Sequence, residues 1–163
     1  MASPIIMTTL GDFYEGDLNY FIEQYNYIES VLARSPKYTA LDSASAAELA
    51  NLCLAASVTC SELIHDISRQ SGLLETRVKA AEAKALDDCQ ETRAVLKRTA
   101  SQSSEALVAA QNKATAARSL LDLLKRQYQI LIAQHYNCRS VAQETHSIHS
   151  GDRASDADLE NFL

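Results

Sequence analysis

The amino-acid sequence predicts an all-α protein: a long antiparallel helical hairpin with an additional N-terminal helix, oligomerising through helices. Two observations favour this fold class. The 163 residues include only 2 Pro and 4 Gly, whereas sandwiches, barrels and doubly wound α/β folds need turn residues at short intervals. Hydrophobic residues make up 47% of the chain and recur at spacings of three and four, which is the pattern of amphipathic helices.

Residues 1–35 are predicted to form an acidic, Tyr-rich helix. Apolar side chains recur at helical spacing from Asp12 to Ala33, and Gly11 with Asp12 offers an N-cap. The charged neighbours of the tyrosines in this segment are acidic, which favours packing over stacking on nucleic-acid bases. Pro36 ends the helix, because the residue before a proline is pushed out of the helical region.

The long hairpin is predicted over residues 42–149. Asp42 or Ser43 is expected to cap a second helix. The apolar pattern then continues past Gly72, which predicts one long, bent helix that ends at about Arg98. A glycine inside a helix costs about 1 kcal/mol relative to alanine and is tolerated.

The turn of the hairpin is expected near residues 99–104, a cluster of small polar residues. Ser103 or Ser104 would cap the last helix, with an acidic residue in its positively charged first turn. This helix is expected to end near Thr145. Residues 150–163 are polar and acidic, which predicts a flexible tail.

Two apolar stripes run along the predicted last helix. The first steps by three and four from Leu107 to Cys138, like a coiled-coil heptad seam. The second lies beside it and includes Ile130. Because a two-helix hairpin buries only one stripe, the second predicts contact with another helix or another subunit. We expect a homo-oligomer whose interface includes Leu120, Leu123, Leu124 and Leu131.

Charge is distributed unevenly along the chain, whose net charge is −6. Residues 1–68 carry a net charge of −7, residues 69–139 carry +5, and residues 140–163 carry −4. Such segregation is typical of a surface that binds a polyanion, but a solvated helical hairpin can show it as well. Both interpretations stay open at this point.

The basic side chains of the middle segment are the candidate nucleic-acid contacts. An antiparallel hairpin would bring five of them, at positions 93, 97, 98, 113 and 118, towards the end that holds the turn. Phosphate binding needs only positive charge held along a surface, and without a base-reading motif it would be independent of sequence. The alternative is a solubilising face with helical partners such as Glu75 and Lys79. The candidates are Arg77, Lys79, Lys84, Arg93, Lys97, Arg98, Lys113, Arg118, Lys125 and Arg126.

The sequence predicts no catalytic residue and no cofactor. It has no Gly-rich phosphate loop, no nucleophile elbow and no metalloprotease motif. Asp87 and Asp88 are adjacent carboxylates, but they lie on an exposed helical surface without a pocket that would raise a pKa. The chain is therefore not expected to be an enzyme.

Metal binding is considered separately because some His and Cys residues have ligand-like spacing. His135 and Cys138 are three residues apart, as are His146 and His149, and such pairs can bind zinc. Cysteines on an apolar stripe also behave as small buried hydrophobes, and we expect no metal. Four irregularly spaced Cys, with no apolar run of 18 residues and no signal peptide, predict reduced thiols in a cytoplasmic protein without a membrane span.

The second half of the chain resembles a known family. Residues 104–131 resemble a helical block of small bacteriophage proteins, in which a Leu-x-x-Ala start is followed by Lys, a leucine cluster, a basic residue and a further Leu. A late Asn/Ser-x-Arg is matched by residues 137–140, and residues 69–98 fit the preceding helix and basic connector. The block is similar to the C-terminal half of UvsY-like recombination mediators of myoviruses.

This resemblance implies a function in DNA recombination. Mediators of this family bind single-stranded DNA and the single-strand-binding protein, load a recombinase onto the strand, and act as ring-like homo-oligomers joined by helices. The residues that would carry the DNA contact are the basic ones between Arg69 and Arg139. For a phage protein, the location would be the host-cell cytoplasm.

Two other functional classes stay open. One is a helical scaffold, chaperone or adaptor that assembles through its second apolar stripe. The other is an inhibitor that binds a protein target through its acidic surface. Salt-dependent retention on single-stranded DNA would separate a mediator from both.

Overall fold

The structure is a computed structural model that describes residues 10–34, 42–89 and 104–160, with side chains through residue 144. A single helical turn at residues 10–13 precedes three helices in these ranges, and no strand occurs in them. The helices are α2 (Leu18–Leu32), α3 (Ser43–Asp88) and α5 (Glu105–Glu160). The predicted all-α fold is confirmed.

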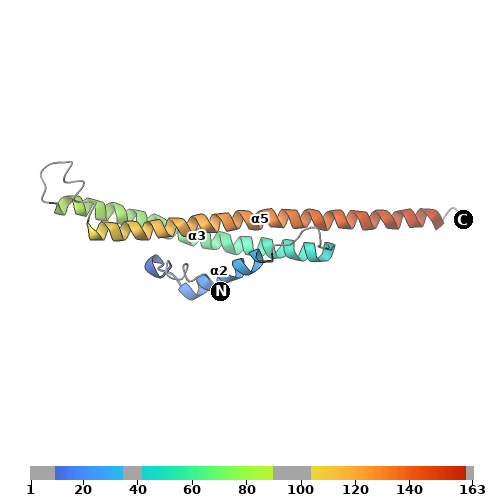
Figure 1. Ribbon diagram of the computed structural model, residues 1–163, viewed down its shortest axis with the longest axis horizontal. Helices are drawn as coiled ribbons and strands as arrows, with labels where there is room; N and C mark the ends of the chain where they lie inside the picture. Colours follow the sequence, from blue (N-terminus) through green and yellow to red (C-terminus); the bar gives the residue numbers. More distant parts are fainter. Residues whose placement is uncertain (1–9, 35–41, 90–103, 161–163) are drawn as a thin grey trace.

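α3 and α5 form a long antiparallel pair, and α2 lies along one side of it (Figure 1). Hydrogen bonds set the alignment of the pair. The Ser43 hydroxyl donates to the Ala142 carbonyl at 3.0 Å, and the Cys60 thiol donates to the Leu124 carbonyl at 3.2 Å. The hairpin with an additional N-terminal helix is therefore confirmed.

The core follows the heptad pattern that the sequence predicts. On α5, buried side chains recur every seven residues at Ala117, Leu124, Leu131 and Cys138, which is the spacing of a coiled-coil seam. They face buried residues of α3 at helical spacing, which include Cys53, Cys60 and Ile67. α2 completes the core with Phe21, Tyr25, Ile28 and Val31.

Side-chain caps explain two of the helix starts. The Asp42 carboxylate accepts a hydrogen bond from the Ser45 amide at 2.7 Å, so α3 begins where the sequence predicts. This bond lowers the pKa of Asp42. For α2 the prediction is wrong: the helix begins at Leu18 rather than near Asp12, because Asp17 caps it by accepting from the Tyr20 amide.

The predicted ends of the two long helices are also wrong. α3 ends at Asp88, about ten residues before Arg98, because the backbone of Cys89 is extended. α5 continues past Thr145 to Glu160, so residues 150–160 are helical. This tail contains no proline, and its single glycine is an energetic cost that a helix tolerates. Residues 99–103 of the predicted turn lie outside the described residues.

The start of α5 agrees with the predicted cap position. The Val108 amide donates to the Ser104 carbonyl at 3.0 Å, which places Ser104 at the N-cap. Glu105 occupies the first turn, where a negative charge is favoured by the helix dipole.

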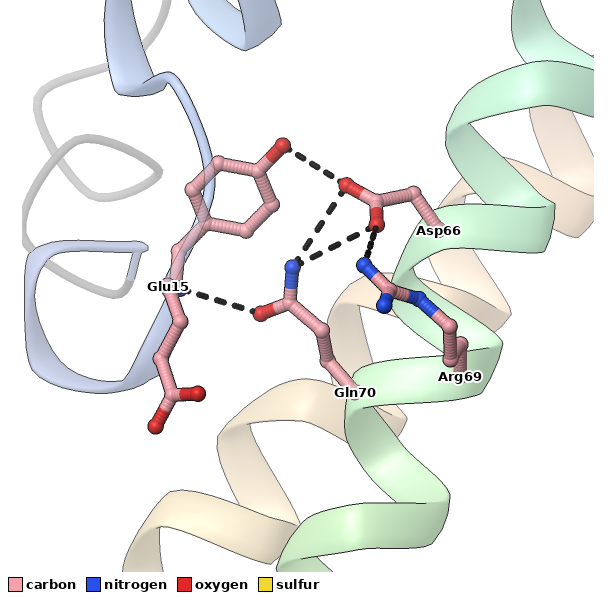
Figure 2. Close-up of polar contacts among 5 residues, drawn as sticks. Glu15, Asp66, Arg69 and Gln70 are labelled. Atoms are coloured by element: carbon pink, nitrogen blue, oxygen red, sulfur yellow. Dashed lines mark hydrogen bonds and ion pairs between the residues drawn. The ribbon is translucent and has the colours of Figure 1, made fainter.

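The segment before α2 is joined to α3 by a cluster of polar contacts (Figure 2). The Tyr14 hydroxyl donates to Asp66 at 2.7 Å, and the Glu15 amide donates to the Gln70 side-chain oxygen at 3.2 Å. Arg69 and Gln70 also donate to Asp66. Burial alone would raise the pKa of Asp66, but these donors hold it below its usual value.

A second polar cluster joins α2 to α5. Gln127, which is buried, donates to the Tyr25 hydroxyl at 3.1 Å and to the Glu29 carboxylate at 2.6 Å. Burial raises the pKa of Tyr25 to about 12. The two clusters fix both the position of α2 along the hairpin and the face that it covers.

α3 contains a stretch that is long and apolar enough, by length and composition alone, to cross a membrane. A core helix of a helical bundle meets the same criterion. In this structure Cys53, Ala56 and Ile67 from this helix are fully buried within the protein.

Candidate functional site

Five of the ten basic residues singled out from the sequence lie towards one end of the hairpin, whereas Lys125 and Arg126 lie near its middle, next to Leu124, which contacts Cys60. The ion pair between Arg118 and Glu75, at 2.9 Å, fixes the alignment of α5 with α3 at the end that holds the five. Because α3 ends at Asp88, Arg77, Lys79 and Lys84 lie within about 17 Å of its end at 1.5 Å per residue. We call this group the cationic end; it consists of Arg77, Lys79, Lys84, Lys113 and Arg118. Arg93, Lys97 and Arg98 lie outside the described residues.

The cationic end is divided between two sides of the hairpin. Arg77 and Lys113 line a hollow next to Asp12 and Glu15, on the side that carries the N-terminal segment. Lys79 and Arg118 line a hollow with Glu75 and Glu82 on another side. Antiparallel packing therefore produces two small mixed-charge surfaces instead of one continuous basic patch.

Two of these cations are already paired. Arg77 contacts Glu15 at 2.6 Å, and Arg118 contacts Glu75. The side chains of both ion pairs are more than two-fifths exposed. Each pair therefore contributes little to the free energy of unfolding. Within the part of the chain that the structure describes, the other candidate cations form no ion pair. These are Lys79, Lys84, Lys113, Lys125 and Arg126.

The predicted oligomer interface is corrected by the structure. Leu120 is 4% exposed, and Leu124 and Leu131 are fully buried within the chain itself. They pack the hairpin and cannot also contact a second subunit in this fold. Only Leu123, at 37% exposure, is accessible. Sequence periodicity does not show which apolar residues of α5 the other helices cover.

An apolar groove between α3 and α5 is the feature that sequence reasoning missed. Its middle is lined by Leu54, Val58, Tyr128 and Ile132. It continues towards the start of α3, where Leu54 lines it together with His135. The sequence could have indicated this groove through Leu54 and Val58. They are four residues apart and lie on a different face of α3 from its buried residues.

The groove and α2 lie on different sides of the hairpin. α3 contacts the N-terminal segment through Asp66 and Gln70, whereas Leu54, Val58 and Ser61 line the groove. On a helix at 100° per residue, these two sets point in clearly different directions. The hairpin therefore has one groove filled by α2 and another that no described helix covers.

Three of the four cysteines are packing residues in this fold. Cys53, Cys60 and Cys138 are fully buried, and burial raises the pKa of each thiol, that of Cys60 to about 11. The His135 ring contacts the Ala50 carbonyl at 2.9 Å. Among the described residues, no group of three or more His, Cys, Asp or Glu side chains could hold a metal ion.

Comparison of the chain with protein-family models, with curated proteins and with solved structures found no match.

Proposed function

We propose that this chain is a non-enzymatic recombination mediator that binds single-stranded DNA without sequence specificity through the cationic end. The observation that carries the proposal is the presence there of Lys84 and Lys113, which form no ion pair within the described residues. Unpaired lysines bind phosphate oxygens without breaking an existing contact.

The arrangement suits a flexible strand better than a duplex. The cations lie on different sides of a narrow two-helix rod, and a single strand can follow such a surface because its backbone bends easily. No base-reading motif accompanies these cations in the sequence, so binding would depend on phosphate contacts. The resemblance to UvsY-like proteins supports a recombinase and a single-strand-binding protein as partners.

Fluorescence anisotropy with a labelled oligothymidylate at several salt concentrations tests the proposal. We expect affinity to fall steeply with salt, with a logarithmic slope of about 0.7 per phosphate contact. Lys84→Ala combined with Lys113→Ala should weaken binding at low salt and flatten the slope. Lys97→Ala with Arg98→Ala should have the same effect.

The matched control is Arg34→Ala, which removes an exposed cation that follows α2 and lies outside the cationic end. This variant should bind as the wild type does. The absence of any anisotropy change at low salt would overturn the proposal. An equal loss in the control would show that the cationic end is not the binding site.

A second candidate function is that of a helical adaptor, and the uncovered groove favours it. An adaptor would bind protein through Leu54, Val58 and Tyr128 and would show no salt-dependent affinity for DNA. The anisotropy experiment therefore separates the two functions.

A further inference from the structure

The uncovered groove exposes large apolar side chains in water. Val58 is 55% exposed, Leu54 is 44% exposed and Tyr128 is 36% exposed, and all three line the same groove. Isolated exposed apolar residues are common, but a continuous line of them along two helices marks an interaction surface.

The groove is part of a longer face of the hairpin. Its lining residues on α3 begin at Ala47 and reach His65, and the same helical spacing leads on to Glu75 and Lys79 in the next hollow. From Ala47 to Glu82 the face is about 52 Å long at 1.5 Å per residue.

We propose that this face binds a second copy of the chain, so that two hairpins form a four-helix core with one α2 on each outer side. The interface does not include Leu120, Leu124 or Leu131 of α5, which are buried within the chain.

The proposal does not rest on DNA binding. The face includes Lys79 and Arg118 of the cationic end. It leaves Lys84 and the hollow with Arg77 and Lys113 free for DNA.

The size of the face fits such a dimer. Two helices, each about 10 Å across, give a width of about 20 Å. The plan area is therefore on the order of 1,000 Å². A standard protein interface buries about 800 Å² on each partner, so the hairpin alone offers enough surface.

Charge complementarity supports a second copy as the occupant. Glu62 lies on the α3 wall of the groove. Lys125 lies one heptad before Ile132 and so belongs to the α5 wall. Neither residue forms an ion pair within the described part of the chain.

The alignment of α3 with α5 places these two charges at similar positions along the axis of the hairpin. The contact between Cys60 and Leu124 places Glu62 and Lys125 within about one helical turn of each other along the axis. A two-fold axis parallel to the helices sets each α3 against the partner's α5. Glu62 then faces Lys125 of the partner subunit, and the symmetry repeats the pair. Such pairs contribute orientation more than affinity.

Light scattering coupled to size-exclusion chromatography tests the inference. At high micromolar concentration the wild type should have twice the 17.9 kDa chain mass. Val58→Lys should shift the protein to the monomer, because it places a charge in the middle of the face. Ile130→Lys is the matched control, since Ile130 is also β-branched and is 48% exposed but lines neither hollow of this face.

Charge reversal tests the proposed axis. Glu62→Lys should weaken the dimer, and adding Lys125→Glu should restore it, with unchanged helical circular dichroism in each variant. A monomeric wild type would overturn the proposal. So would a dimer that Val58→Lys leaves intact, or one that the Ile130→Lys control disrupts equally. A dimer that is weakened by Glu62→Lys but not restored by the second change would overturn the two-fold arrangement.

Discussion

The Tyr14 hydroxyl donates a 2.7 Å hydrogen bond to the Asp66 carboxylate, across 52 positions of sequence. The bond joins the segment before α2 to the middle of α3. It is assisted by the charge of its acceptor, which makes it stronger than a bond between neutral groups. The same carboxylate also accepts from Arg69 and Gln70 of α3, and the Glu15 amide adds a bond to Gln70.

Removing this bond should destabilise the protein measurably. Tyr14→Phe keeps the ring, which packs edge-on against Phe21, and removes only the hydroxyl. We expect the free energy of unfolding to fall by about 1.5 kcal/mol, the usual value for a bond to a charged group. Urea unfolding followed by circular dichroism measures it. Tyr20→Phe, at a position that is 51% exposed, should change nothing.

The same carboxylate should make stability depend on acid pH. The pKa of Asp66 is lower in the folded protein than in a free carboxyl. Its contribution to stability is therefore complete above about pH 4, the ordinary value, and is lost as the pH falls through the lower folded pKa. The melting temperatures of the wild type and of Asp66→Asn should converge as the pH is lowered into the acid range. Parallel curves would contradict this assignment.

Replacing two glycines with alanine should change the free energy of unfolding in opposite directions. A Cβ at Gly16 would lie 2.6 Å from the Tyr14 hydroxyl oxygen, so Gly16→Ala must displace the ring and weaken its bond to Asp66. We expect a loss of about 1–3 kcal/mol. Gly72 is exposed inside α3 with nothing within 4 Å of the added atom. Gly72→Ala should stabilise the protein by about 0.5–1 kcal/mol. Urea titrations of the two variants provide the comparison.

Deleting residues 151–163 should leave the hairpin folded. The first residue of α3, Ser43, contacts Ala142, so the last part of α5 extends beyond its partner helix (Figure 1). Residues 140–163 carry a net charge of −4, but α5 carries residues 151–160 away from the cationic end, at least about 50 Å beyond Arg118 at 1.5 Å per residue. This distance is several Debye lengths at physiological salt, so the truncated protein should bind oligothymidylate as tightly as the full chain does. Tighter binding by the truncated protein at low salt would contradict this position of the tail.

The fold could be predicted because its local signals agree with one another. Asp42 is a strong capping residue next to a long apolar pattern, and the seven-residue spacing from Ala117 to Cys138 specifies a paired helix. The end of α3 could not be predicted in this way. Val95 and Leu96 continue the helical spacing past Asp88, so no local signal marks the point at which the backbone becomes extended.

The candidate sites could be predicted only in part, because they depend on packing between helices. Arg118 and Lys113 are near the hairpin end as expected, but their division between two sides follows from the way α5 rotates against α3. Leu124 and Leu123 are adjacent and equally apolar in sequence. One is fully buried and the other is 37% exposed, and only the positions of α2 and α3 decide between them.

The alignment of the hairpin also sets an order in which it can fold. The contact between Glu75 and Arg118 closes a loop of 43 positions, whereas that between Ser43 and Ala142 closes one of 99. The entropy cost of loop closure grows with loop length. Packing of α3 against α5 should therefore begin at the cationic end and proceed towards the start of α3. α2 can bind only after both helices have met, because Gln127 and Asp66 belong to different arms. Substitutions at Phe21 should therefore speed unfolding, whereas substitutions near Ala114 should slow folding.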